Sequence, residues 1–373
     1  MIFRSIQNMP SSPEKARLPV VASSVSLGFL VLCVVVYILN VASAIMIPFM
    51  MAVFVWYLIN AMARGLGKVV FFKNTQIPRP LCFMAAILLL VLGMMDVFEV
   101  ISHNVSIVAR EAPAYQAHLS EMLTGLLAPF HLEQQPTIKE LMGYLDIGAI
   151  MAALVKMLSG IAGKTVVVMF YTGFLLYEQR FFNKKLSGMA ANAKTESQVR
   201  KILFNIDIKV QRYIWVKTLM SALAGILTLV ILSLWRVDFA VFWGVIAFIL
   251  NFIPYVGSLL SIILPSAIAM VQFGDGHTAL GVLASLAVLH GLIGHMLDPM
   301  LMGENLNLSP IFIISSLAMW EMIWGVPGMF LSIPILAAIM ITLAQFHRTR
   351  PIAILLSKTG VIDEGYVQGK KPG

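Results

Sequence analysis

Long uncharged stretches dominate this chain. The ranges 20–39, 41–63, 239–273 and 278–297 contain no Asp, Glu, Lys or Arg. A helix that crosses the apolar part of a bilayer needs about 20 such residues. A helix also satisfies its own backbone hydrogen bonds, which lipid cannot do. The sequence therefore predicts an all-α, polytopic helical membrane protein.

Composition excludes several other classes of protein. Of the 373 residues, 59% are hydrophobic and 12% are charged, with a mean hydropathy of +0.89, whereas soluble domains carry about 25% charged residues. The net charge of +8 lies beside the apolar stretches, as the positive-inside bias produces, and not on a water-soluble module. We therefore expect a lipid bilayer as partner and no nucleic acid.

No catalytic motif stands out in the sequence. His-Glu-x-x-His and Gly-x-Ser-x-Gly are both missing, and the two cysteines, Cys33 and Cys82, are too few for a metal cluster or a disulfide framework. Gly163-Lys164-Thr165 lacks the earlier glycine of a phosphate-binding loop. The sequence thus predicts no enzyme, no cofactor and no metal site.

Basic residues mark the segments expected on the cytoplasmic side. The range 1–19 has three Lys or Arg against one acid, 64–79 has four and no acid, and 180–217 has nine against two acids. Such residues concentrate in cytoplasmic loops. We therefore predict a multi-pass inner-membrane protein with both termini in the cytoplasm.

The first half of the chain is expected to cross the membrane four times. A third span near 81–101 leads to 102–157, where five acids outnumber three basic residues, as expected outside the cell, and a fourth span near 158–177 returns. The predicted divisions are 1–101, 102–157, 158–216, a core segment 217–346 and a tail 347–373.

One basic segment, 199–214, has an apolar stripe at helical spacing. The stripe consists of Val199, Ile202, Leu203, Ile206, Val210, Tyr213 and Ile214. We predict an amphipathic helix that lies on the inner leaflet or against a neighbouring subunit.

Two apolar runs near the C-terminus are too long for one span. The range 239–273 is interrupted by NFIPYVGS at 251–258, and 309–346 is interrupted by WGVPG at 324–328. We predict two half-helices that meet at a tip in each run, within an inverted repeat. Re-entrant hairpins are favoured over pairs of short crossings. The fold would then have about six full spans plus two broken segments.

The first tip suggests a substrate or ion pathway. Pro254 is expected to end the first half-helix, Gly257 to permit a tight turn and Ser258 to cap the second. A helix N-terminus at mid-membrane favours a polar or anionic solute, and unwound carbonyls favour a cation. The alternative is a plain helix kink.

Isolated ionisable residues are further candidates, because they are expensive in lipid. His295 and Asp298, three positions apart, are expected to pair on one helix face, with His290 pointing elsewhere. The alternative is a boundary turn at Asp298-Pro299 whose carboxylate meets water. Glu321 either titrates in the pathway, snorkels or pairs with a basic residue of another helix.

Several motifs together resemble the autoinducer-2 exporter family of bacterial membrane proteins. They are NFIPYVGS at 251–258, LDPMLMG at 297–303, LNLSP at 306–310 and WGVPGMFLSIP at 324–334. The resemblance implies an inner-membrane transport protein of about eight hydrophobic segments that forms a homo-oligomer, with a pentamer as one form. It also implies either export of autoinducer-2 or sodium/proton antiport.

The leading hypothesis is a secondary transporter that exports a small solute by alternating access. The alternatives are a sodium/proton antiporter that uses Asp298 or Glu321, and a non-transporting scaffold that holds a partner on 199–214. The residues expected in the pathway, some by the resemblance, are Asn251, Pro254, Tyr255, Gly257, Ser258, His295, Asp298, Pro299, Ser309, Pro310, Glu321, Gly325, Pro327 and Gly328. Gly303 matches a motif of the resemblance.

Overall fold

The fold is built almost entirely from helices. The computed structural model describes residues 28, 30–31, 33–67, 70–71, 75–76, 78–127, 147–189, 192–302 and 306–361. The helices are α2 (Ser43–Leu66), α3 (Arg79–Leu127), α5 (Ile147–Met189), α6 (Ala193–Leu234), α7 (Ala240–Leu250), α8 (Val256–Phe273), α9 (Gly276–Leu292), the π-helix η2 (Ile293–Leu297), α10 (Asp298–Met302), α11 (Pro310–Trp324), α12 (Val326–Gln345) and α13 (Arg350–Leu356). Two short strands, β1 (Val70–Phe71) and β2 (Thr75–Gln76), pair antiparallel.

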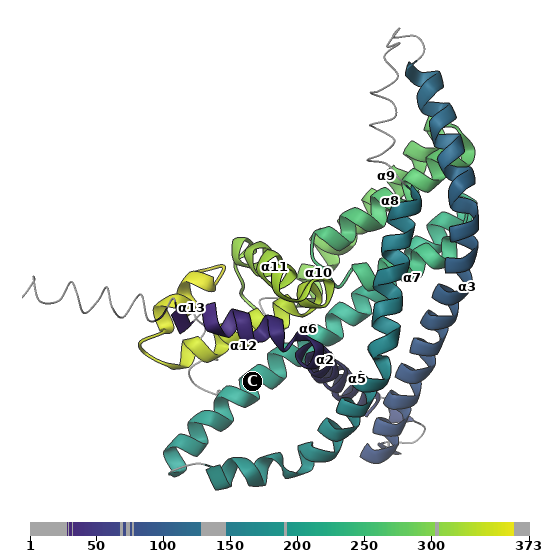
Figure 1. Cartoon of the computed structure of the whole chain (residues 1–373). Coiled ribbons are helices and arrows are strands. Elements are labelled where there is room, and N and C mark those ends of the chain that lie inside the picture. Colours follow the sequence, from purple (N-terminus) through teal and green to yellow (C-terminus); the bar gives the residue numbers. More distant parts are fainter. Residues whose placement is uncertain are drawn as a thin grey trace, which may run out of the picture.

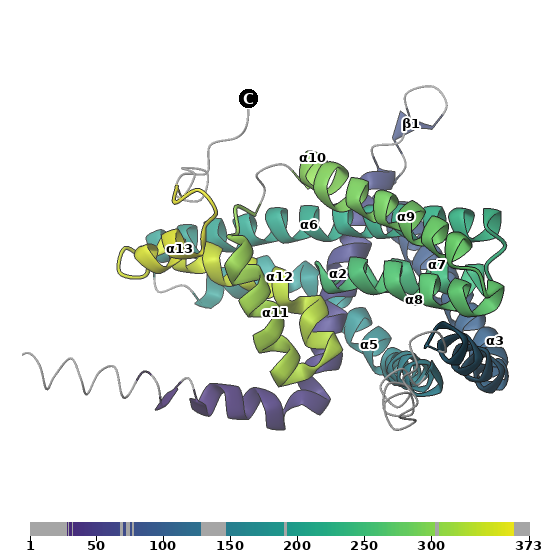
Figure 2. The ribbon, with the colours of Figure 1, turned by 90° about the horizontal axis from the view of Figure 1, so that it is seen from above.

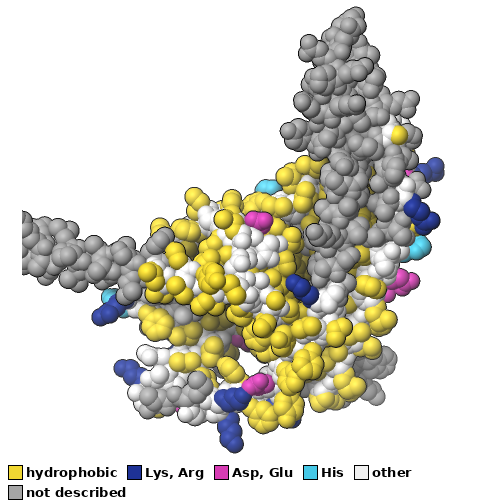
Figure 3. Space-filling view, in the orientation of Figure 1, with side chains coloured by type: hydrophobic (Ala, Val, Ile, Leu, Met, Phe, Trp, Pro, Cys, Tyr) yellow, Lys and Arg dark blue, Asp and Glu magenta, His cyan; other side chains and the backbone are white. Residues whose placement is uncertain are grey.

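Among the described residues, six helical segments are long and apolar enough to cross a membrane. They are Ser43–Leu66, Pro80–Asn104, Ala193–Leu234, Val256–Phe273, Gly276–Leu297 and Val326–Gln345. Hydrophobic side chains cover much of the visible face in Figure 3, and Met322 and Leu234 are 81% and 78% exposed. Side chains of this kind need lipid or protein as solvent. The prediction of a polytopic helical membrane protein is therefore confirmed.

Helix α6 is the central helix, against which several other helices pack. It packs against α7 and α9 along its C-terminal half and against α2 and α12 nearer its start. Figure 1 shows α3 and α5 side by side on one flank and α11, α12 and α13 on the other. Helices α5 and α6 meet at the bottom of that view and diverge from there.

The first half of the chain forms longer helices than the spans predicted in it. The predicted third span lies in α3, which continues to Leu127, and the predicted fourth span lies inside α5, which already begins at Ile147. Both helices thus extend into the predicted external segment, of which 128–146 lies outside the described residues.

The predicted amphipathic helix 199–214 is the first part of α6. It runs without a break into the apolar half of that helix. Val210, Tyr213 and Ile214 of its stripe are buried in a core cluster with side chains of α2 and α12. The expectation that these three residues face lipid or another subunit is wrong, because the chain's own helices cover them.

Both long apolar runs are broken as predicted, into α7 and α8 and into α11 and α12. In the first break, Tyr255 has φ +62° and ψ −57°, and the Val256 N–H donates to the Pro254 carbonyl at 2.7 Å, which makes a strained γ-turn. In the second, Gly325 has φ +65° and ψ −145°, a region that favours glycine. The half-helix α7, with 11 residues, is about 16 Å long and cannot cross about 30 Å of hydrocarbon.

Glycine lets the two arms of each hairpin touch. A Cβ on Gly257 would lie 1.8 Å from the Leu250 carbonyl oxygen, and a Cβ on Gly328 would lie 2.0 Å from that of Trp320. Gly257 therefore serves close packing, whereas Tyr255 takes the left-handed conformation of the turn. The predicted cap is also wrong: α8 begins at Val256, so Ser258 already lies inside its first turn.

Candidate functional site

A row of polar side chains on α6 defines the candidate site. Lys217, Ser221 and Thr228 are all buried, and their spacing of four and seven residues places them on one face of the helix. Each contacts a polar residue of another segment. These residues are Asp298, Asn251 and His290, respectively.

The charged contact in this row joins Lys217 to Asp298. The Lys217 Nζ lies 3.0 Å from Asp298 Oδ2, and the two side chains are only 6% and 17% exposed. Buried charges persist only when they are paired, because removing them from water is costly. The second carboxylate oxygen, Oδ1, is buried and has no partner among the described residues. It is free to accept a hydrogen bond from a solute or to ligate a cation.

The first hairpin tip reaches the same face of α6. Asn251, at the end of α7, is 3% exposed and donates from Nδ2 to the Ser221 hydroxyl at 3.0 Å. Ser221 lies one turn from Lys217, about 6 Å along the helix axis. The tip and the ion pair are therefore neighbours. Tyr255, in the turn of the tip, is 55% exposed.

The two hairpins meet through aromatic rings. Phe252 of the first tip and Phe330 of α12 have ring centroids 4.7 Å apart, and Phe54 of α2 lies 4.7 Å from Phe330. All three belong to, or pack against, one core cluster. A displacement of either hairpin therefore changes packing at the other.

The predicted pairing of His295 with Asp298 is wrong. His295 is exposed, and its Nδ1 lies 3.2 Å from the Gly291 carbonyl, while Asp298 turns to Lys217. The reason is the π-helix η2, whose i→i+5 hydrogen bonds add a residue to the turn, so that α-helical spacing does not apply there. The alternative of a water-exposed boundary turn is also wrong, since Asp298 is mostly buried.

The remaining predicted residues lie away from the α6 row. Glu321 is exposed on α11, which packs on α12. Gly325, Pro327 and Gly328 form the second hairpin's turn and the start of α12. Ser309 and Pro310 begin α11 beside the C-terminal α13, where the Ser309 N–H donates to the Leu356 carbonyl at 2.9 Å.

Two residues of the motif LDPMLMG at 297–303 lie partly or wholly outside the described residues. Pro299 lies in α10, and its side chain lies outside the described part of the chain, as does Gly303. The structure thus brings together Asn251 and Asp298 from the predicted set.

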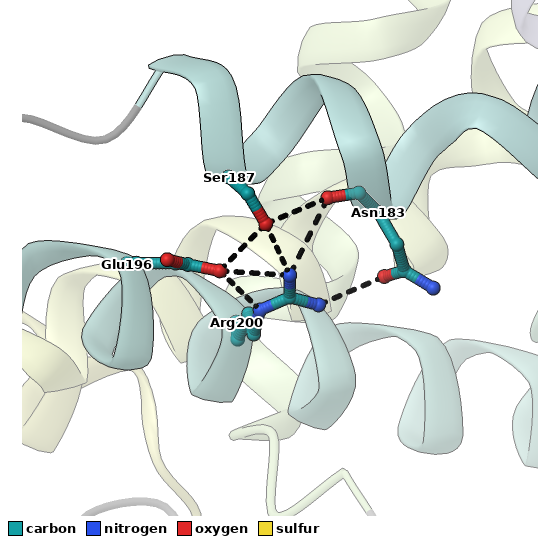
Figure 4. A network of polar contacts seen from close by, with 4 residues as sticks. All are labelled: Asn183, Ser187, Glu196 and Arg200. Atoms are coloured by element: carbon teal, nitrogen blue, oxygen red, sulfur yellow. Dashed lines mark hydrogen bonds and ion pairs between the residues drawn. The ribbon is translucent and has the colours of Figure 1, made fainter. Parts of the chain in front are cut away.

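A second polar cluster ties the end of α5 to the start of α6 (Figure 4). Arg200 binds Glu196 Oε1 from Nη2 at 2.8 Å, Ser187 Oγ from Nη2 at 2.9 Å and Asn183 Oδ1 from Nη1 at 2.9 Å. The Ser187 hydroxyl also contacts Glu196 at 2.8 Å. Three side chains around one guanidinium thus join the end of α5 to the start of α6.

Sequence reasoning missed the α6 half of the site. Lys217 was counted only as a marker of the cytoplasmic side, and Ser221 and Thr228 read as unremarkable polar residues in a span. One signal was present: Lys217 is the last basic residue before a long uncharged stretch, and a serine follows it at i+4. Such a pair predicts a polar patch on one helix face.

Two broken hairpins that meet beside a polar helix face are the architecture of a membrane transport protein. The family model of the AI-2E family transporter matches residues 27–348. The chain belongs to this family.

Relatives span almost the whole chain. The AI-2 transport protein TqsA of Escherichia coli is 28% identical over 331 residues, which cover 85% of this chain and 90% of that protein. A Haemophilus influenzae protein with a provisional transport assignment is 26% identical over 344 residues, covering 88% and 95%. YhhT of Escherichia coli, also provisionally assigned to transport, is 25% identical over 324 residues, covering 85% and 89%.

Proposed function

We propose that this chain is a secondary transporter that exports a small polar solute of the autoinducer-2 kind by alternating access. The observation that carries the proposal is the position of the Asn251 tip, one helical turn from the Lys217–Asp298 pair on the same face of α6. The name of TqsA as an AI-2 transport protein favours this cargo class.

The residues of this face suit a solute rich in hydroxyl groups. Asp298 Oδ1 accepts a hydrogen bond, and the Lys217 ammonium has donors beyond the one that it gives to Asp298 Oδ2. Because both charges are already paired, a neutral solute is bound without burial of a new charge. The hydrogen bond between Asn251 and Ser221 then connects the bound solute's site to the first hairpin.

The hairpins supply the moving parts. The strained turn at Tyr255 and the glycine turn at Gly325 are the flexible points, whereas the packed arms at Gly257 and Gly328 move as rigid units. Contact between Phe252 and Phe330 couples the two movements. We propose that these hairpins rock against α6 and expose the site alternately to either side.

One observation favours a second candidate, the sodium/proton antiporter. A buried carboxylate with an unpartnered oxygen, as in Asp298, is the ligand type that sodium and protons both bind. In this alternative Lys217 is the counter-ion that the cation displaces.

We also propose the inner membrane as location, with the basic junction of α5 and α6 and both termini in the cytoplasm, and a homo-oligomer as the assembly. Cysteine labelling of intact cells at the α5–α6 junction checks the orientation. Light scattering of the detergent-solubilised protein checks the assembly.

Flux in proteoliposomes tests the proposed function. Purified wild type and Asp298→Asn are reconstituted in proteoliposomes that are loaded with autoinducer-2. Efflux of autoinducer-2 and the internal pH after sodium jumps are followed in parallel. The matched control is Glu178→Gln, which removes one partner of an exposed ion pair with Lys185 on α5; such pairs contribute little.

Each outcome assigns the chain to one class. Efflux in wild type that Asp298→Asn abolishes and the control retains supports the exporter. Sodium-dependent proton movement lost in the same variant supports the antiporter. A folded wild type with neither flux overturns both, and the scaffold is then tested by neutralising Lys201, Lys209 and Arg212.

A further inference from the structure

Polar contacts between α6 and the segment that runs from α9 through η2 to α10 extend over almost the thickness of a bilayer. From one end to the other the contacts are Lys217–Asp298, Thr228–His290 and Trp235–Ser285. Lys217 and Trp235 are 18 residues apart on α6, which corresponds to about 27 Å along the axis. The hydrocarbon core is about 30 Å thick. The middle contact therefore lies in the apolar interior.

His290 is the titratable residue of this middle contact. It is 3% exposed and lies on the face of α9 that carries the buried Val282 and Leu286. Its Nε2 lies 3.3 Å from the Thr228 hydroxyl, whereas its Nδ1 is buried and has no partner among the described residues. Whichever tautomer is present, one ring nitrogen is left to bind something else.

Thr228 is oriented for this ring. Hydroxyls elsewhere in these helices bond to a carbonyl of their own helix one turn earlier, as Thr218, Ser266 and Ser285 do. The Thr228 hydroxyl instead contacts His290 across the interface. A buried polar atom in an apolar interface costs stability unless it is hydrogen-bonded, and His290 Nδ1 has no such partner among the described residues. An ionisable group of this kind calls for a functional explanation.

We propose that His290 is a proton-binding site that couples transport to the proton gradient. This inference rests on the proposed function and assigns to His290 the coupling step that the Asp298 site lacks. One proton binds at Nδ1 from water on one side of the membrane and leaves to water on the other side after the core has changed conformation. Bonds between heavy atoms do not change.

The charged surroundings of His290 explain how the proton acts on the transport core. Helices α7 and α8 contain no titratable residue, and η2 with α10 contributes His295, which is exposed, and Asp298, which is paired. From α6, Lys217 is likewise paired, with Asp298. A proton on His290 therefore adds an unpaired positive charge to a buried interface, which favours a conformation in which the ring reaches water.

A transport measurement with a matched histidine control tests this site. Wild type, His290→Gln and His295→Gln are reconstituted with autoinducer-2 and an imposed pH gradient of one unit. Gln keeps a hydrogen-bond partner for Thr228 but does not titrate, while His295, five residues away and exposed, makes its contact within its own helix. Thermal melting in detergent checks that all three proteins are folded. Thr228→Val, which leaves the imidazole of His290 in place, is a second variant.

If one proton is exchanged per neutral solute and the membrane potential is held at zero, a gradient of one pH unit sustains about a tenfold solute gradient. We expect this ratio in wild type and in His295→Gln, and a ratio of one in His290→Gln despite continued downhill flux. Thr228→Val should keep the coupling and shift its pH midpoint. An unchanged tenfold ratio in His290→Gln overturns the inference and leaves the proposed function standing. A folded wild type that moves no solute and no protons overturns the proposed function and the inference with it.

Discussion

The two broken hairpins share one backbone design but differ in what surrounds them. In each, a short first arm turns back through a strained or glycine turn, and a glycine of the second arm packs on a carbonyl of the first. These glycines are Gly257 and Gly328. The same mechanical solution thus occurs twice, as an internal repeat requires, although the two tips have little sequence in common.

The two hairpins differ in the residues that they contact. Asn251 joins the first to the polar face of α6. Beside the second tip, the Trp324 indole donates to the Leu39 carbonyl at 3.0 Å and its ring lies 4.7 Å from that of Trp320. The comparison teaches that one hairpin contacts the polar site while the other supports it through apolar packing. Polar substitutions should therefore matter near the first hairpin and steric ones at both.

The largest difference in stability is expected between substitutions of two charged residues, Lys217 and Glu321. Lys217→Met leaves the Asp298 carboxylate buried without its partner, and breaking a buried ion pair costs about 3–5 kcal/mol. Glu321→Gln, at an exposed position beside the second tip, should change the free energy of unfolding by less than about 0.5 kcal/mol. Denaturant unfolding in detergent measures both.

A double variant isolates the ion pair from other effects. Lys217→Met combined with Asp298→Leu removes both charges and should recover most of the lost stability. Equal destabilisation by Lys217→Met and Glu321→Gln would show that the two hairpins do not differ in this respect.

Steric substitutions should affect both hairpins alike. Gly257→Ala and Gly328→Ala place a Cβ only 1.8 and 2.0 Å, respectively, from a backbone carbonyl oxygen, so the arms must separate. We expect each to cost about 3 kcal/mol or more, the upper end for overpacking. Gly291→Ala is the control, because no atom lies within 4 Å of its added Cβ. A thermal melt in which only one of the two tip variants is destabilised would contradict the repeat.

The repeated hairpins were predictable because proline and glycine interrupt apolar runs that are too long for one span. The contact of Asn251 and Asp298 with the same face of α6 was not predictable in the same way. It depends on η2, a π-helix within a sequence of ordinary helical residues, and the expected partner of Asp298 was therefore His295 instead of Lys217. Local spacing rules assume a regular helix, and a tertiary ion pair between segments 81 residues apart lies beyond them.

A smaller contrast is expected for neutral hydrogen bonds. Asn251→Ala removes a buried donor and leaves the Ser221 hydroxyl without its 3.0 Å partner, which should cost about 1–3 kcal/mol. The corresponding bond inside the second hairpin, from Ser316 Oγ to the Ser332 carbonyl, is long at 3.4 Å. Ser316→Ala should cost less than about 1 kcal/mol. Chemical denaturation of both variants ranks them, and the reverse order would argue that the first tip is not held by its polar contact.

The smallest effect concerns the helices that adjoin the two hairpins. The Asp275 carboxylate, between α8 and α9, caps α9 by accepting from the His277 and Thr278 N–H groups at 3.0 and 3.1 Å. Ser309, which precedes α11, makes no such side-chain bond. These backbone bonds, with that of His277 contributing most, hold the pKa of the Asp275 carboxyl below its ordinary value. The first unit should therefore have an acid-sensitive cap that the second lacks.

The sign of this effect follows from the lowered pKa of Asp275. The stabilisation is fully present above the pKa of the unfolded chain, near about 4, and is lost as the pH falls through the lower folded value. Asp275→Asn keeps a capping side chain without the charge, so its melting temperature should fall less than that of wild type between pH 5 and about pH 3. Ser309→Ala should follow the wild-type curve. Parallel curves for wild type and Asp275→Asn would mean that the carboxylate contributes no more than a neutral cap, and the two units would then begin their next helices on equal terms.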